Sequence, residues 1–155
     1  FVREGIRKPY VIRPSDLPGG PQGLYSTGIT PEEMRRAAQE GVLAMDPWNR
    51  HLADAGPADR GRAMFARMCS ACHTADGQYN PVKPLVAGWD SAQYASNLSN
   101  LHATKPAMPH YSPTRDDLLA LTAYLRSLSR GSADDQRFLA QVARRVDELR
   151  PRARE

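Results

Sequence analysis

The hydrophobic residues of this chain fall into several stretches with helical spacing, separated by segments rich in proline and glycine. In the clearest stretch, Leu118, Leu121, Leu125 and Leu128 recur at intervals of three and four residues, which places their side chains on one face of an α-helix. Thr114 is a favourable N-cap, and acidic residues follow it in the first turn. The pattern predicts a core helix that begins after Thr114.

Four further helices are predicted from the same kinds of signal. Thr30 and Pro31 suit the cap and first position of one helix, and Asp90 suits the cap of another. Near the C-terminus, Val142 and Val146 lie on the apolar face of an amphipathic helix, which must be covered by the rest of the fold, a partner or a membrane surface. The chain is expected to be all-α, with helices over residues 30–45, 57–68, 90–101, 114–130 and 134–149.

The segments between these helices predict how the chain is divided. We expect a processed product or part of something longer, because the chain begins at Phe1 rather than methionine. It contains no run of eighteen apolar residues, so no transmembrane helix is expected. The predicted units are an extended basic Pro/Gly-rich arm (1–30), a helical N-terminal extension (31–56), a central domain (57–131) and a C-terminal amphipathic helix (132–155).

Candidate chemistry is concentrated in the run Cys69-Ser70-Ala71-Cys72-His73. This is C-x-x-C-H, the pattern of covalent c-type haem attachment. Each cysteine can add to one of the two haem vinyl groups, and the histidine that follows is carried under the iron as its ligand. Cys69 and Cys72 are the only cysteines in the chain, so no other thiol competes for this role.

Two other uses of C-x-x-C fit this sequence less well. A redox dithiol usually follows a strand, and no strand is predicted before Cys69. A zinc site of four protein ligands needs a second pair, but His51, His102 and His110 do not form a finger-like array. Haem attachment is therefore the favoured interpretation.

Met108 is the candidate for the second axial ligand. Its thioether suits haem iron, and Met/His ligation raises the reduction potential; the flanking Pro106 and Pro109 can stiffen the backbone around it. His110 is a competing ligand, which would lower the potential. Met108 could instead fill a gap in the core. The iron would then be five-coordinate, and the protein could bind a diatomic gas or act as a peroxidase.

The segment from about Pro57 to Arg130 resembles a class I (monohaem) cytochrome c domain. The resemblance implies an all-α domain wrapped around one covalent haem c, with flanking helices added. It also implies that the first and last helices cross where Gly61 and Phe65 meet Leu121, Tyr124 and Leu125. The matching pieces are Gly61-Arg62-Ala63-Met64-Phe65, Cys69 to His73, Pro84-Leu85-Val86-Ala87-Gly88, Met108-Pro109 and Leu121-Thr122-Ala123-Tyr124-Leu125.

Three residues after the attachment motif are further candidates for the haem site. In the family, a proline carbonyl accepts a hydrogen bond from the proximal histidine, and the resemblance places Pro84 in that role; such a bond fixes the ring and makes the ligand more basic. Trp89 and Tyr94 each join a large apolar ring to a polar tip, so either could bond a haem propionate. Ordinary core packing is the alternative for both.

The predicted function is one-electron transfer by the haem iron, with no enzymatic reaction carried out by the chain itself. Extensions on both sides of the haem domain favour a subunit or domain of a respiratory or other membrane-associated complex over a soluble periplasmic shuttle. In bacteria this haem attachment occurs outside the cytoplasm, so the resemblance implies a periplasmic or periplasm-facing location. The net charge of +4 favours acidic redox partners or peripheral contact of the basic extensions with anionic lipid. Nucleic acid is not expected as a partner.

Overall fold

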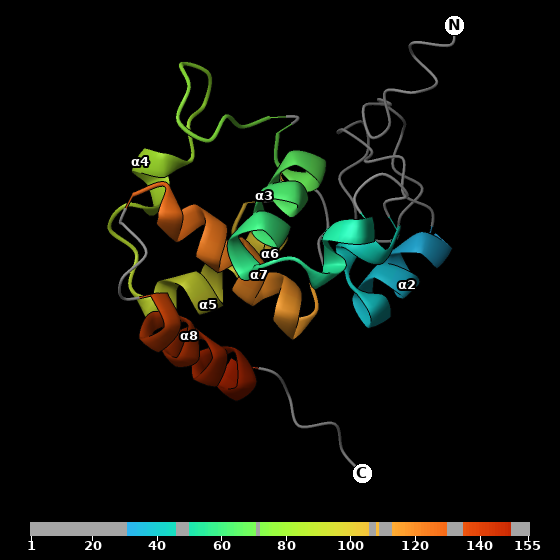
Figure 1. Cartoon of the computed structure of the whole chain (residues 1–155). Helices are drawn as coiled ribbons and strands as arrows, with labels where there is room; N and C mark the ends of the chain where they lie inside the picture. Colours follow the sequence, from blue (N-terminus) through green and yellow to red (C-terminus); the bar gives the residue numbers. More distant parts are fainter. Residues whose placement is uncertain are drawn as a thin grey trace, which may run out of the picture.

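The computed structural model describes residues 31–45, 50–70, 72–105, 108, 113–129 and 135–149. The arm predicted for residues 1–30 lies outside them. The all-α prediction is confirmed, since the described residues contain helices and a single isolated bridge between Thr74 and Pro81. The helices are α2 (Pro31–Glu40), α3 (Pro57–Met68), α4 (Lys83–Val86), α5 (Ser91–Ser99), α6 (Leu101–Thr104), α7 (Arg115–Ser127) and α8 (Asp135–Leu149), with 3₁₀ turns η1 (Val42–Met45) and η2 (Arg50–Asp54) (Figure 1).

Helices α3 and α7 form the most extensive helix pair of the fold. They approach closely because Gly61 has no side chain: a Cβ there would lie 2.0 Å from the carbonyl oxygen of Ala120 and 2.7 Å from Tyr124 Cβ. Beside this contact, the rings of Phe65 and Tyr124 are 5.5 Å apart between centroids. The predicted crossing is confirmed for Gly61, Phe65 and Tyr124.

The N-terminal helix is shorter than predicted. Helix α2 ends at Glu40, and the expected continuation to Met45 is replaced by Gly41 at φ +91° and the 3₁₀ turn η1. The Val42 N–H donates to the Asp117 carboxylate at 3.1 Å, so its partner is a buried side chain of α7 rather than a helical carbonyl. The side chains of Val42 and Leu43 then join the main hydrophobic core.

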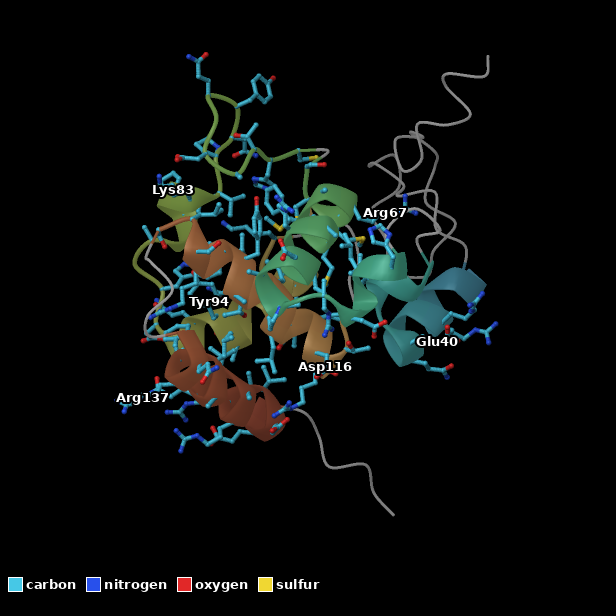
Figure 2. All side chains as sticks on the ribbon, viewed as in Figure 1. Glu40, Arg67, Lys83, Tyr94, Asp116 and Arg137 are labelled. Atoms are coloured by element: carbon cyan, nitrogen blue, oxygen red, sulfur yellow. The ribbon has the colours of Figure 1, made fainter. Side chains whose placement is uncertain are left out.

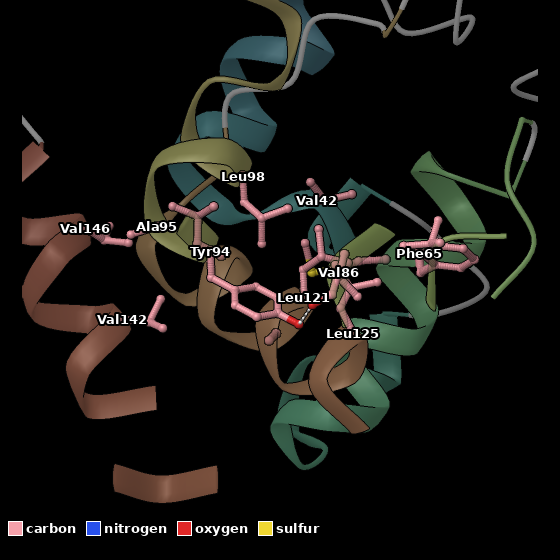
Figure 3. Close-up of a cluster of buried hydrophobic side chains, with 14 of the residues drawn as sticks. Val42, Phe65, Val86, Tyr94, Ala95, Leu98, Leu121, Leu125, Val142 and Val146 are labelled. Carbon is pink, nitrogen blue, oxygen red and sulfur yellow. Dashed lines mark hydrogen bonds between the residues drawn. The ribbon is translucent and has the colours of Figure 1, made fainter. Parts of the chain in front are cut away.

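The C-terminal helix α8 lies on α5 and α7. Its residues Val142 and Val146 are fully buried (Figure 3). The Arg126 guanidinium at the end of α7 lies 3.6 Å from the ring centroid of Phe138, and Arg115 forms an ion pair with Asp147 at 2.8 Å. The apolar face of α8 is therefore covered by the rest of the chain at Val142 and Val146, whereas Leu149 at its C-terminal end is 54% exposed.

Between α3 and α7, the structure contains two short helices that were not predicted, α4 and α6. The short helix α4 lies between the predicted helices 57–68 and 90–101, where no helix was expected. Asp90 caps α5 in a capping box with Gln93, as its cap position predicted. Asn100, at φ −139°, ends the helical hydrogen bonding before α6 begins. Among the described helices, none is long and apolar enough to span a membrane.

Candidate functional site

The attachment motif lies in a tight turn directly after α3. The Cys69 N–H donates to the Phe65 carbonyl at 2.8 Å, and the N–H groups of Cys72 and His73 both donate to the Cys69 carbonyl, at 3.1 and 2.9 Å. Both cysteines are free thiols; Cys69 is partly buried and Cys72 is exposed. Helix α3, fixed against α7 by the Gly61 contact, thus determines where the motif lies.

The two thiols differ in their environment. Burial, with a smaller contribution from the neighbouring Cys72, raises the pKa of the Cys69 thiol to about 12. The pair consists of one shielded and one accessible sulfur on the same turn.

The side chain of His73 is oriented by a backbone carbonyl. Its Nδ1 lies 3.2 Å from the carbonyl oxygen of Asn80. A carbonyl can only accept a hydrogen bond, so Nδ1 carries the proton, and in the neutral imidazole Nε2 then keeps the lone pair. This is the tautomer in which Nε2 can bind a metal.

The assignment of this carbonyl to Pro84 was wrong. Pro84 lies in the first turn of α4, whereas the acceptor comes from Asn80, at the end of the loop that precedes that helix. Asn80 has φ +45°, a left-handed conformation that asparagine tolerates better than most residues. Its side-chain amide also donates to the Cys72 carbonyl at 2.8 Å.

The loop that returns Asn80 to the motif is closed by hydrogen bonds at its base. Thr74 Oγ1 donates to the Tyr79 carbonyl at 2.7 Å and accepts from the Gly77 N–H at 3.2 Å. The Val82 N–H donates to the Thr74 carbonyl at 2.9 Å. Figure 2 shows the loop projecting from the body of the helices.

Tyr94 is a core residue in this structure, and a contact of its hydroxyl with a haem propionate stays a prediction. It is 2% exposed, and its hydroxyl donates to the Val86 carbonyl at 3.5 Å (Figure 3). Its ring contacts Trp89 and Phe138 edge-on, with centroids 5.3 and 5.6 Å away. Trp89 is partly buried, so its role in binding haem stays a prediction.

Met108 is half-buried in the chain between α6 and α7. Its N–H donates to the Lys105 carbonyl at 2.9 Å, which closes a turn directly after α6. The flanking prolines and His110, the competing ligand, lie outside the described residues. His51 is exposed, and the side chain of His102 is outside the described part of the structure.

Sequence reasoning missed Asn80 and the structural role of Asp117. Asn80-Pro81 is a dipeptide that favours turns, and this signal could have marked the end of the loop. Asp117 was expected only in the first turn of its helix, where it does complete a capping box with Thr114. Its bond to Val42 had no local signal, because the two residues are far apart in sequence.

Comparison with known proteins agrees with this geometry. The profile of a family described as "Cytochrome C oxidase, cbb3-type, subunit III" matches residues 56–125. A protein of Synechocystis sp. (strain ATCC 27184 / PCC 6803 / Kazusa) named "Cytochrome c-553-like" is 34% identical over 93 residues, covering 56% of this chain and 84% of that protein. No solved structure matches. Two free thiols on one turn, followed by a histidine with Nε2 available, fit a covalently bound haem. The chain belongs to the cytochrome c family, as a monohaem class I domain whose covalent haem c transfers electrons.

Proposed function

We propose that Cys69 and Cys72 anchor one haem c through thioether bonds and that His73 Nε2 and Met108 Sδ are its axial ligands. The observation that carries this proposal is the Nδ1 contact of His73 with the Asn80 carbonyl at 3.2 Å. It leaves Nε2 as the metal-binding nitrogen directly after two free thiols. The haem supplies one-electron redox chemistry, while the chain sets its position and potential.

The assignment of Met108 is supported by its place in the fold. It follows α6 in a hydrogen-bonded turn and precedes α7, whose N-terminus is fixed by the capping box of Thr114 and Asp117. A half-buried thioether between two anchored helices has a restricted range of positions. Trp89 is retained as a candidate contact to a haem propionate.

We further propose that the protein works in a membrane-associated electron-transfer complex on the periplasmic side. The family profile, described as subunit III of a cbb3-type oxidase, supports this assembly. In the proposed division of the chain, residues 57–131 hold the haem and the segments 31–56 and 132–155 flank it. Helix α8 uses its apolar face inside the chain, so its exposed face, or the basic arm (1–30), is the part left to contact acidic partners or anionic lipid.

The haem assignment is tested by the optical spectrum of the purified protein in both oxidation states. We expect a ferrous spectrum typical of haem with two thioether links, and a weak far-red band of methionine-sulfur ligation in the ferric state. Met108→Ala should abolish that band. Met68→Ala is the matched control, because Met68 is a partly buried methionine on α3, and it should leave the band unchanged. A high-spin ferric spectrum with ready carbon monoxide binding by wild type would instead favour the gas-binding or peroxidatic alternative.

The assembly is tested by fractionating native membranes. A chain that remains with an oxidase through mild detergent extraction and sizing supports the complex. Recovery of all the haem-loaded chain in the periplasmic fraction would contradict it and support a soluble shuttle.

A further inference from the structure

Asn80 makes two contacts with the attachment motif, one through its backbone and one through its side chain. Its carbonyl lies 3.2 Å from His73 Nδ1, and its side-chain amide donates to the carbonyl of Cys72 at 2.8 Å. Because Cys72 and His73 are adjacent, Asn80 forms hydrogen bonds with both the second cysteine of the attachment motif and the predicted axial ligand. Neither contact is made by any other residue in the described part of the chain.

The backbone conformation of Asn80 is what makes both contacts possible together. At φ +45° it is the only non-glycine residue with positive φ among the described residues. In this left-handed conformation the carbonyl and the side chain of one residue both face the motif. Most other side chains would be strained there, whereas asparagine is among the residues that tolerate it.

The loop that carries Asn80 is held in place from the other side. Thr74 follows His73 directly and bonds the Tyr79 carbonyl with its hydroxyl at 2.7 Å. A side chain at Gly77 would come within 3.1 Å of this hydroxyl. Hydrogen bonds of Thr74 thus fix the start of the loop, and hydrogen bonds of Asn80 fix its end to Cys72 and His73.

We propose that Asn80 is a positioning residue whose side-chain amide holds its own carbonyl on His73 and thereby tunes the reduction potential of the haem. A carbonyl that accepts from Nδ1–H makes the imidazole a more basic ligand. A more basic ligand stabilises ferric over ferrous iron and lowers the potential. Loss of the amide frees the carbonyl to drift, weakens the bond to Nδ1 and raises the potential. The inference rests on the proposed ligation by His73.

The bond to Cys72 is exposed, so water competes for both of its partners. Its removal should cost little global stability. A residue that only supported the loop would change the unfolding midpoint but not the reduction potential of the haem. A positioning residue is expected to do the opposite.

The test compares Asn80→Gly, Asn80→Ala and Gln78→Ala in the haem-loaded protein. Glycine removes the amide while keeping the left-handed backbone unstrained, and alanine adds strain to the same loss. Gln78 is an exposed amide residue in the same loop and serves as the matched control. The readouts are the reduction potential by redox titration and the solvent exchange rate of the His73 Nδ1 proton in the ferrous state by NMR.

We expect Asn80→Gly to favour the ferrous form by roughly threefold, in the range of one hydrogen bond. This corresponds to about 28 mV at 59 mV per tenfold for one electron. The Nδ1 proton should exchange faster in this variant, Asn80→Ala should show a larger change, and Gln78→Ala should match wild type. An unchanged potential and exchange rate in Asn80→Gly, or an equal shift in Gln78→Ala, would overturn the inference.

If neither Asn80 variant retains haem, a measurement on the wild-type protein still tests the inference. One Asn80 side-chain amide proton should then be protected from exchange in the ferrous protein, and its exchange at the rate of the Gln78 amide would contradict the inference. A wild-type protein without haem, or with a ligand other than His73, would refute the proposed function itself. Haem ligated by His73 together with an unresponsive Asn80 refutes only the inference.

Discussion

Replacing Gly61 by alanine tests whether the close crossing of α3 and α7 holds the haem domain together. Gly61 lies inside α3, where alanine normally stabilises a helix by about 1 kcal/mol relative to glycine. Local propensity therefore predicts a more stable protein. The tertiary contact predicts the opposite.

The magnitude follows from the atoms that the new methyl group would meet. The alanine Cβ would lie 2.0 Å from the carbonyl oxygen of Ala120, 2.6 Å from its carbonyl carbon and 2.7 Å from Tyr124 Cβ. None of these atoms is the free end of a flexible side chain, so α7 itself has to move by roughly 1.5 Å to restore ordinary contact distances near 3.5 Å. Overpacking of this kind costs about 3 kcal/mol or more when the backbone must shift.

After subtracting the gain in helix propensity, we expect Gly61→Ala to lower the free energy of unfolding by about 2 kcal/mol. At roughly 4 °C per kcal/mol for a domain of this size, the melting temperature should fall by about 8 °C. The assay is urea and thermal unfolding of the haem-loaded protein, followed by haem absorbance and far-UV circular dichroism.

Gly88→Ala is the matched control for this substitution. A Cβ at Gly88 would meet no atom within 4 Å, and Gly88 has no positive φ. We expect this variant to be as stable as wild type or more stable by up to about 1 kcal/mol. A Gly61→Ala protein at least as stable as wild type would refute the reasoning, since it would show that helix propensity outweighs the crossing.

Two further predictions concern the segments that flank the haem domain. Asp117→Ala leaves the N–H groups of Val42 and Thr114 without their carboxylate acceptor, so we expect the free energy of unfolding to fall by about 2–4 kcal/mol and hydrogen exchange at Val42 to become faster. The control Asp116→Ala changes an exposed site in the same turn and should lower the free energy of unfolding by less than about 1 kcal/mol. Equal costs for the two substitutions would contradict the role assigned to Asp117. Val146→Ala removes two methyl groups from a fully buried site on α8, so urea unfolding should show a loss of about 2 kcal/mol. A smaller loss than that of Arg115→Ala, which breaks only a solvent-exposed ion pair worth about 0–1 kcal/mol, would show that packing does not hold α8.

Local signals in the sequence were sufficient for the helices and the attachment motif. Thr114 and Asp90 form capping boxes where their residue types predicted caps, because a cap depends on residues within one turn of each other. The leucine spacing of α7 and the valine spacing of α8 identified the buried faces, because helical periodicity requires no knowledge of the partner surface. The order of Cys69, Cys72 and His73 carries its chemistry within five consecutive residues.

Contacts between distant residues decided what the sequence could not. Local signals predicted that the N-terminal helix continues to Met45, but the structure ends it at Glu40. Two residues later, the Val42 N–H donates to the carboxylate of Asp117 on a helix far away in sequence. Resemblance assigned the histidine acceptor to Pro84, yet the loop geometry brings Asn80 to that position. Tyr94 has a polar tip that suited a propionate, but the packing of α4 and α8 around it directs its hydroxyl to Val86. Sequence by itself determined which groups are present and which helices carry them. Only tertiary structure selected the partner of each polar group, because that choice depends on which backbone and side-chain atoms the folded chain brings within hydrogen-bonding distance.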